Sequence, residues 1–346
     1  MFGVVINKYG NESVLNYQTD LKTPQPKPNQ VMVEVHASSV NPLDLMKREG
    51  YGAIIFEKQR QNKFPWALGS DFSGVVKDIG SQVTKFKVGD EVWGCTSHAN
   101  SGTHVEFVNI DVDEITIKPS NLNHLEAASL PYAALTTWSA LIRWAGLRPS
   151  DLKGKKVFIQ GGAGGVGCFS IQLFKNLGCD VATTCSERNT NLVKSLGADY
   201  VIDYNEISFD EELKDFDIAY DLLGNDVLEN SIDRCCKILK KDINSHYITL
   251  THDFVRTLDS KGLLLGMPHA LYLRQKQKNK FKPINIHWSI YRPSLSGLEQ
   301  LTDLVEEGVI KPVIDSTYNL RDLRDAHEKL GTGHVSGKIV IDHTND

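Results

Sequence analysis

The segment FIQGGAGGVGCFSIQLFKNLG, residues 158–178, holds the most informative local pattern in this 346-residue chain. Five glycines fall within seven residues, between an apolar run typical of a buried strand and a run with the apolar spacing of a helix. Gly162, Gly164 and Gly167 match G-x-G-x-x-G, which binds a dinucleotide where it follows a strand and opens a helix. An ordinary tight turn is the alternative, but the strand–helix context favours nucleotide binding.

The physical basis of this prediction is the backbone of the loop. Glycine leaves no Cβ between the backbone and a ligand, and it permits positive φ. The N-terminus of the following helix offers free N–H groups and a partial positive charge to a pyrophosphate. The loop is therefore expected to hold the pyrophosphate of a nicotinamide dinucleotide and to place the nicotinamide against a cleft walled by the first domain.

Downstream of the loop, strand-like and helix-like segments alternate. The expected strands are 156–160, 180–185, 200–204, 216–224 and 246–250, and the expected helices are 166–178 and 191–198. Such alternation predicts a parallel, doubly wound sheet. Gly178 is expected to end the first of these helices as a C-cap.

The first 120 residues have a different texture. Short apolar runs such as 30–40, 71–80 and 104–110 are separated by Pro, Gly, Asp and Asn, which predicts a compact β domain. After a helix at 296–308, the last apolar runs resemble this domain in texture, so the C-terminus is expected to fold back onto it. The fold class is α/β, with a β domain and a doubly wound parallel-sheet domain.

Composition excludes several functional classes. The net charge is −5, and the one basic run, RQKQKNKFK at 274–282, is interpreted as a solvated helix end, so nucleic acid is not a favoured partner. No apolar run approaches the ~20 residues that span a membrane. Six cysteines without a C-x-x-C pair indicate a reducing compartment rather than a disulfide framework. The N-terminus reads as a first strand and not as a signal or transit peptide.

The end of the second strand bears on cofactor choice. A site that prefers NAD carries an acid about 20 residues after the glycine loop. Residues 184–188 read TCSER, so the strand ends without a carboxylate. Ser186 can donate to a 2′-phosphate and Arg188 can neutralise it. Glu187 is the counter-argument, because a shift of one residue would place it on the ribose. The pattern favours NADPH over NADH.

At this point the chain resembles a known family. GGAGGVG (161–167), LGAD (196–199) and VIDY (201–204) look like the quinone-oxidoreductase branch of the medium-chain dehydrogenase/reductases. In the N-terminal half, SSVNPLDLMKREGYG (38–52), LGSDFSGVV (68–76), VGDEVWG (88–94) and SLPYAALTTWSAL (129–141) support the resemblance. It implies a GroES-like catalytic domain at 1–127 and 293–346, and a Rossmann NADP-binding domain at 128–292.

The resemblance also implies a function. It predicts a zinc-independent NADPH oxidoreductase of quinones or enones, mitochondrial and connected with coenzyme Q biosynthesis. No presequence is visible, so a cytoplasmic location is the alternative. The rival interpretation is a nucleotide-binding protein with little turnover, whose partner is a reticulon or a quinone-biosynthesis assembly. The oligomeric state is left open. Relatives dimerise by joining Rossmann sheets edge to edge, so a homodimer is one possibility, and the expected edge strand is near INIHWSIY (284–291).

Further cofactor contacts are carried over from the resemblance. Ser186 and Tyr204 would face the ribose phosphate, with packing between helix and sheet as the alternative for Tyr204. Thr249 and Thr251 would lie near the nicotinamide. Tyr291 and the turn before the last strand would close the cleft, with a surface turn as the alternative for His334. The full set is Gly162, Ala163, Gly164, Gly165, Val166, Gly167, Ser186, Arg188, Tyr204, Thr249, Thr251, Tyr291, His334, Val335 and Ser336.

The catalytic candidates lie in the first domain. Hydride transfer to an electrophilic acceptor needs orientation and a proton source, and a neutral tyrosine phenol can supply the proton. Tyr51 matches the family's active-site loop, with a packing aromatic as the alternative. Asn41, in the VNPLD turn, could hold the carboxamide or a substrate oxygen. Asp44 is expected to cap a helix that begins at Leu45.

Metal binding is not expected. Catalytic zinc needs three Cys, His or acidic ligands. By resemblance these would fall near Asn41, Ser70–Asp71 and Tyr132, where only Asp71 could bind a metal.

A structural zinc lobe would need clustered cysteines near 95–110. Only Cys95 is present there, and His98 and His104 lack the usual spacing. The long polar segment 51–71 departs from the family pattern and is interpreted as a lid.

Overall fold

The structure is a computed structural model that describes residues 1–59, 64–97 and 102–345. The chain divides into two compact units. Unit 1 comprises Met1–Leu135 and Pro293–Asp346, and unit 2 comprises Thr136–Arg292. The expected boundary after residue 127 therefore falls inside unit 1, before helix α4 (Pro131–Trp138), which crosses from one unit to the other.

Unit 2 is built on a parallel sheet. Its strands are β9 (Lys156–Gln160), β10 (Asp180–Cys185), β11 (Tyr200–Asp203), β12 (Ile218–Asp221), β13 (His246–Thr249) and β14 (Asn285–Trp288). They are ordered β11-β10-β9-β12-β13-β14 and every pair is parallel. The order reverses between β9 and β12, which is where open sheets of this kind bind their ligands. The predicted doubly wound parallel sheet is confirmed.

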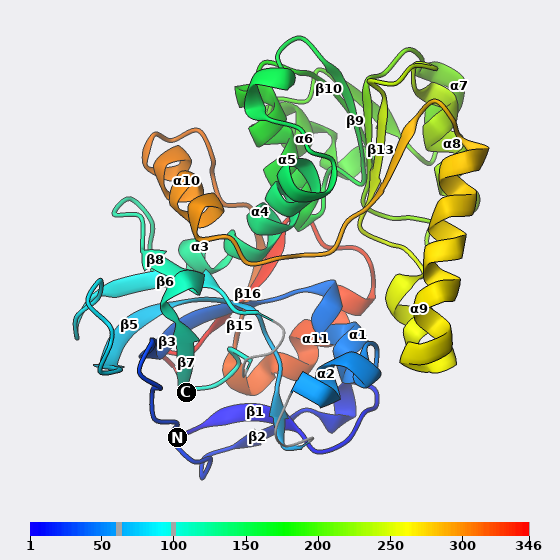
Figure 1. Cartoon of the computed structure of the whole chain (residues 1–346). Coiled ribbons are helices and arrows are strands. Elements are labelled where there is room, and N and C mark those ends of the chain that lie inside the picture. The colour runs from blue at the N-terminus through cyan, green and yellow to red at the C-terminus, as the bar shows by residue number, and fades with distance from the viewer. Residues whose placement is uncertain (60–63, 98–101, 346) are drawn as a thin grey trace. The chain divides into compact units, whose positions relative to one another are not determined.

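Helices cover both faces of this sheet (Figure 1). They are α5 (Gly165–Asn176), α6 (Thr190–Ser195), α7 (Phe209–Glu212), α8 (Ser231–Ile238) and α9 (Phe254–Lys280). Figure 1 shows α5 and α6 on one side of the strands and α7 and α8 on the other. Gly178 follows α5 with φ of 76°, as a helix C-terminal glycine does.

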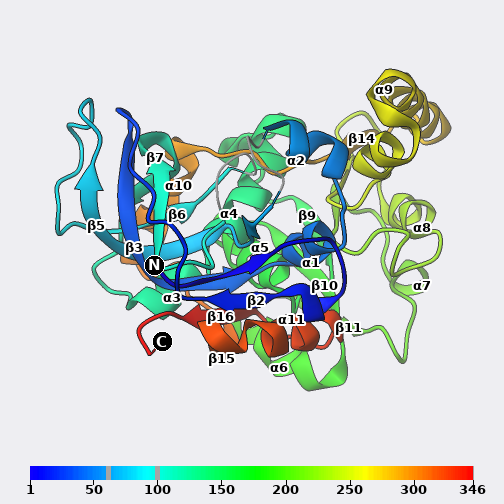
Figure 2. The ribbon, with the colours of Figure 1, turned by 90° about the horizontal axis from the view of Figure 1, so that it is seen from below.

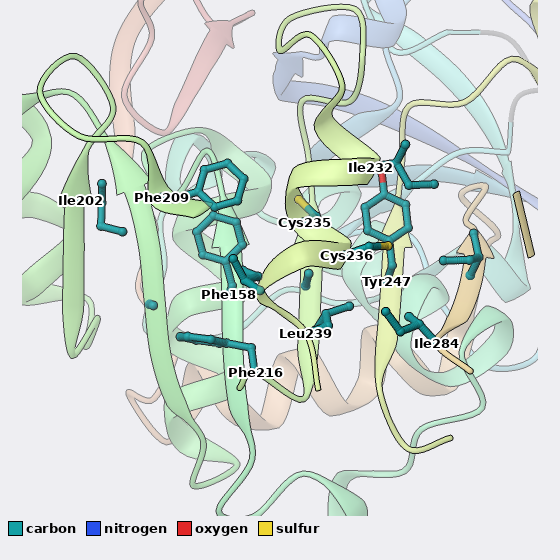
Figure 3. Packing of buried hydrophobic residues seen from close by; sticks show 14 of the residues in the cluster. Phe158, Ile202, Phe209, Phe216, Ile232, Cys235, Cys236, Leu239, Tyr247 and Ile284 are labelled. Carbon is teal, nitrogen blue, oxygen red and sulfur yellow. The ribbon is translucent and has the colours of Figure 1, made fainter. Parts of the chain in front are cut away.

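Figure 3 shows the core under α7 and α8. Phe158 of β9 stacks on Phe209 of α7, with ring centroids 4.5 Å apart. Cys235 and Cys236 of α8 and Tyr247 of β13 pack into the same cluster. Burial of one large apolar side chain of this kind contributes about 1.5–3 kcal/mol. This packing under α7 and α8 therefore stabilises the sheet that carries the glycine loop.

Helix α9 was not anticipated from the sequence beyond its basic end. Its residues include Pro268, and Gly262 breaks the helical backbone with φ of 73°. Helix breakers inside a segment lower a helix prediction. The expected solvated helix end is confirmed, because Lys276 and Lys280 in its last turns are exposed. Among the described helices, none has the length and apolar character needed to cross a membrane.

Unit 1 contains two sheets. The smaller has the order β2-β1-β4, and the larger the order β15-β16-β3-β5-β6-β8, with β7 also paired to β3. The strands are β1 (Gly3–Ile6), β2 (Asn16–Gln18), β3 (Gln30–Val40), β4 (Trp66–Ala67), β5 (Asp71–Ile79), β6 (Glu91–Cys95), β7 (Phe107–Asp111), β8 (Ile115–Ile117), β15 (Ile314–Asn319) and β16 (Lys338–Asp342). The predicted return of the C-terminus is confirmed, since β16 pairs antiparallel with β3.

The helices of unit 1 are α1 (Pro42–Arg48), α2 (Ala53–Gln59), α3 (His124–Ala128), α10 (Leu295–Glu306) and α11 (Leu323–Gly331). Figure 2 shows α11 beside β15 and β16. Leu323 and Ala326 of α11 pack with Ile339 and Ile341 of β16 in one apolar cluster. This packing fixes the start of β16, where Lys338 lies.

Candidate functional site

The glycine loop leaves β9 and opens α5, as the motif requires. Gly161 and Gly162 donate to the side-chain and backbone oxygens of Thr184 at 3.1 and 3.0 Å, which ties the loop to β10. Gly164 is the N-cap residue of α5. The first N–H groups of a helix have no acceptor within it. The loop therefore presents backbone donors at the carboxyl edge of the sheet.

The three motif glycines have different roles. A Cβ on Gly162 would lie 2.1 Å from Thr183 Oγ1, and one on Gly167 would lie 2.4 Å from the Gly161 carbonyl oxygen. Both positions are therefore closed to larger residues by the protein itself. At Gly164 the nearest atom to a Cβ would be 3.7 Å away. The protein leaves space there, which fits the close approach of a pyrophosphate. The geometry of the three motif glycines is therefore compatible with a bound dinucleotide.

The ribose end of the predicted cofactor site lies where β10 and β11 finish. Tyr204 N donates to Cys185 O at 3.2 Å, so Tyr204 and Ser186 follow neighbouring strand ends. Ser186 is half-buried, whereas Glu187 and Arg188 are exposed. Tyr204 is 56% exposed, so it is not packed between helix and sheet. The structure brings together the residues predicted to contact a 2′-phosphate, and their role stays a prediction.

Asp221, at the end of β12, accepts several hydrogen bonds that were not predicted from the sequence. Buried Asp221 accepts from Gly224 N at 2.8 Å, from Ser231 Oγ at 2.7 Å and from the Tyr247 hydroxyl at 2.8 Å. A Cβ on Gly224 would lie 1.7 Å from Thr251 Oγ1. Asp221 thus holds the β12 loop closely against Thr251, one of the predicted nicotinamide neighbours. An aspartate at the end of a buried strand was the available signal.

The remaining predicted cofactor residues lie apart in the chain. Thr249 ends β13, and its hydroxyl approaches Thr251 Oγ1 at 3.3 Å. Tyr291 is buried in unit 2. His334 is exposed in a turn of unit 1, as expected from the alternative interpretation that it belongs to a surface turn. Ser336 N donates to Asp315 at 2.9 Å. Their contacts with a cofactor stay predictions.

A buried polar group lies in unit 1 around Asn41. We call Ser39, Asn41, Asp71 and Lys338 the Lys338 cluster. Asp71 Oδ2 accepts from Ser39 Oγ at 2.5 Å, from Asn41 Nδ2 at 2.9 Å and from Lys338 Nζ at 3.2 Å. Lys338 also donates to Asn41 Oδ1 and, at 3.4 Å, to Val40 O. All four residues are less than 9% exposed.

Tyr132 adjoins this cluster, and Tyr51 is near enough to Tyr132 to affect it electrostatically. Tyr132 donates its backbone N–H to Asp71 Oδ1. Burial of the Tyr132 phenol, with smaller effects of Cys95, Asp44, Asp71 and Tyr51, raises its pKa well above 10. Tyr51 is half-buried in the turn between α1 and α2. The raised pKa keeps this phenol protonated but makes it a weaker acid, so it is the position of Tyr132 beside Asp71 that adds it to Tyr51 as a candidate donor.

The expectation for Asp44 needs a correction. Helix α1 begins at Pro42 with Asn41 as its N-cap, not at Leu45. Asp44 lies one turn inside and accepts from Asn41 N at 2.9 Å and from Gly69 N at 3.1 Å. Pro is favoured in a first helical turn, so the helix starts earlier than expected. Burial raises the pKa of Asp44. Its bonds to two backbone N–H groups tie the Asn41 turn to the segment between β4 and β5.

The residues near Asn41 do not fit a zinc ion. Within residues 1–59, 64–97 and 102–345, no group of three or more His, Cys, Asp or Glu is arranged to hold a metal. Asp71 is the acid at the position implied for zinc, and its oxygens are occupied by donors that include an ammonium. His104 bonds Ser38 instead. His98 and residues 60–63 of the expected lid lie outside the described residues.

Comparison with known proteins gives the class that this fold and site define. A family model described as "Alcohol dehydrogenase GroES-like domain" matches residues 27–120, and one described as "Zinc-binding dehydrogenase" matches residues 196–341. The chain belongs to the medium-chain dehydrogenase/reductase family, on its quinone-oxidoreductase branch, and is an NAD(P)H-type oxidoreductase of that family.

The names of individual proteins similar to this chain are more specific than the family descriptions. The human protein named "NAD(P)H oxidoreductase RTN4IP1, mitochondrial" is 39% identical over 351 residues, covering 97% of this chain and 88% of the relative. "Reticulon-4-interacting protein 1, mitochondrial" from Caenorhabditis elegans is 31% identical, covering 91% of this chain and 88% of the relative. The quinone oxidoreductase structure from Coxiella burnetii has a TM-score of 0.82 and 32% identity, with 99% of each chain covered.

Proposed function

We propose that this chain is an NADPH-preferring, zinc-independent reductase of quinones or enones. The end of β10 carries the cofactor part of this proposal. Ser186 and exposed Arg188 follow the strand, and no carboxylate occupies its last residue, Cys185. A serine hydroxyl and a guanidinium suit a 2′-phosphate, whereas an acid there would repel it.

The chemistry divides between two sets of residues. When bound, NADPH supplies a hydride, which together with one proton converts a quinone into a hydroquinone and leaves NADP⁺. Backbone donors of 162–167 hold the diphosphate. The Asn41 amide bonds the acceptor's carbonyl oxygen and so draws electrons from the carbon framework. Tyr51 or Tyr132 donates the proton that the reduced oxygen requires.

Zinc independence follows from the donor set. A Lewis acid needs open coordination to several anionic or imidazole ligands. The Asn41 region supplies two acids, of which Asp71 already accepts from an ammonium and Asp44 from two backbone N–H groups. The acceptor must then be electrophilic without metal assistance, as quinones and enones are. Metal analysis of the purified chain tests this statement, and stoichiometric zinc contradicts it.

Arg188→Glu tests the cofactor preference. We expect the Kd for NADPH to rise by more than about tenfold because the charge facing the phosphate is reversed. The Kd for NADH changes little, so the preference narrows or inverts. Lys194→Glu, a basic residue of the next helix, serves as a control for net charge. Unchanged preference in Arg188→Glu overturns the NADPH proposal. Addition of 1,4-benzoquinone in the same cuvette, followed by NADPH absorbance, tests turnover.

A second function has support in the relatives' names. Proteins similar to this chain are called reticulon-4-interacting, so we also consider a nucleotide-binding partner of a reticulon or of a quinone-biosynthesis assembly. Tight NADPH binding without oxidation by any quinone or enone favours this alternative. A link to coenzyme Q biosynthesis belongs to the reductase proposal, and is tested by coenzyme Q content after deletion of the gene.

Location and assembly are part of the proposal. The relatives' names support a mitochondrial location, which fractionation of cells tests directly. Strand β14 ends the unit 2 sheet, so its outer edge is open to pairing by a second copy. We propose a homodimer through this edge. Its mass in solution measured by light scattering decides the question.

A further inference from the structure

Lys338 has no role in the predicted site, yet its surroundings are those of a functional group. It begins β16 and is 7% exposed. Its ammonium donates to Asn41 Oδ1, to Asp71 Oδ2 at 3.2 Å and to Val40 O at 3.4 Å. An ammonium has three hydrogens, and here each has an acceptor. Lys338 therefore has no donor left for a substrate, and it acts only through the groups it bonds.

The main consequence concerns the orientation of the Asn41 amide. An ammonium cannot accept a hydrogen bond, so the amide must turn its oxygen to Lys338. Its nitrogen then faces Asp71 Oδ2 at 2.9 Å. Both ends of the amide are fixed by charged partners, and bonds to charged groups are stronger than neutral ones.

The hydrogen-bond inventory singles out one remaining donor. Asp71 receives four donors, from Tyr132 N, Ser39 Oγ, Asn41 Nδ2 and Lys338 Nζ. The Ser39 hydroxyl hydrogen goes to Asp71. The Asn41 nitrogen carries two hydrogens, of which one goes to Asp71. Its second N–H is the donor of the cluster that these bonds leave for a ligand.

We propose that Lys338 is a positioning residue, which holds the Asn41 amide so that its second N–H is directed at the carbonyl oxygen of the hydride acceptor. This inference rests on the proposed reductase function. The ammonium also withdraws electrons through the amide oxygen, which strengthens the N–H as a donor. A purely structural role, in which Lys338 only neutralises buried Asp71, is the competing explanation.

Lys338→Met separates the two roles because methionine keeps the length of the stem and removes the charge. We expect kcat for benzoquinone to fall by about 10- to 100-fold, as expected for loss of a charge-assisted bond. The KM for benzoquinone and the Kd for NADPH stay within about threefold. Lys118→Met is the matched control, since Lys118 is also a buried lysine of unit 1 and its partners among the described residues are Glu91 and backbone carbonyls. It is expected to lower Tm but not kcat.

Two double variants sharpen the test. Asp71→Asn with Lys338→Met removes both charges, so Tm recovers toward the wild type while kcat stays low. Recovery of both Tm and kcat overturns the positioning role. In Asn41→Ala with Lys338→Met, the loss of kcat is no larger than in Asn41→Ala alone, because both changes remove one donor. If the two single losses of kcat multiply in this double variant, the positioning role of Lys338 is also overturned.

A readout that needs no turnover keeps this inference distinct from the proposed function. The side-chain amide of Asn41 gives two NMR signals. In the wild type we expect them well separated and slow to exchange with solvent, and in Lys338→Met they converge and exchange faster. If the wild type binds NADPH but reduces no quinone, the reductase function fails. The amide signals then still decide whether Lys338 fixes Asn41, and unchanged signals in Lys338→Met overturn it.

Discussion

The glycine loop of unit 2 and the Lys338 cluster of unit 1 are assembled in opposite ways. The loop is continuous in sequence, and its working groups are backbone N–H donors whose positions follow from glycine and a helix start. In the cluster, Asn41 and Lys338 are 297 residues apart and meet because β16 pairs with β3. A ligand site made of backbone can be recognised locally. One made of side chains depends on strand register over the whole chain.

The largest expected effect tests whether a glycine of the loop is required by packing within the protein or by the bound ligand. Gly167→Ala places a Cβ 2.4 Å from the Gly161 carbonyl oxygen and 2.6 Å from Gly162 Cα, both of them backbone atoms. We expect the free energy of unfolding to fall by about 1–3 kcal/mol, as in overpacked cores, and NADPH binding to be lost. Chemical denaturation and fluorescence titration measure the two quantities.

Gly164→Ala is the matched partner of that change. The nearest protein atom would be 3.7 Å away, so the fold is expected to keep its Tm within a few degrees. Nucleotide affinity is expected to fall more than about tenfold, because the methyl group occupies space used by the diphosphate. Equal effects of both substitutions on Tm would mean that the loop glycines are structural alone, and the comparison with unit 1 would lose its basis.

The second expected effect concerns the buried histidines of unit 1. The Ser38 hydroxyl lies 3.0 Å from His104 Nδ1 and 2.8 Å from His343 Nε2. Burial is the main cause that lowers the pKa of His104 to about 3 and that of His343 to about 3. Between pH 6.5 and about 3 the unfolded chain binds protons that the folded chain excludes. Stability therefore falls as pH decreases through this window, by about 1.4 kcal/mol per pH unit for each histidine.

Urea unfolding between pH 5 and 7.5 measures that slope. His104→Gln keeps a polar group beside Ser38 and removes one titrating ring, so its stability is expected to depend less steeply on pH than that of the wild type. His334→Gln is the control, since His334 is exposed and meets water in both states. Parallel curves for the wild type and His104→Gln would contradict the prediction. Asp210, whose pKa is lowered to about 2, loses its proton well below this range.

The same contrast explains what the sequence could predict. Strand–helix alternation and the glycine spacing are local, so the parallel sheet, helices α5 and α6 and the loop were foreseen. Lys338 was not among the residues predicted for the site, although a lysine that begins an apolar strand such as KIVID needs a buried partner. Its partner Asp71 could be identified only after β3, β5 and β16 were known to be adjacent. Helix α9 was hidden by Gly262, Gly266 and Pro268, which lower a helix prediction, and its backbone does leave the helical conformation at Gly262.

The smallest expected effect tests the part of the cofactor site that is predicted to bind the ribose 2′-phosphate. Tyr204→Phe removes one hydroxyl from a side chain that is 56% exposed, so Tm is expected to stay unchanged. If that hydroxyl bonds the 2′-phosphate, affinity for NADPH falls about two- to tenfold, the range of one hydrogen bond, and affinity for NADH does not change. Tyr200→Phe is the matched control, because Tyr200 begins β11, the strand that Tyr204 follows, is 48% exposed and has its hydroxyl 3.5 Å from Glu212. An equal loss for both nucleotides would mean that the ring of Tyr204 is not selective for the phosphate, and that Ser186 and Arg188 carry the preference between them.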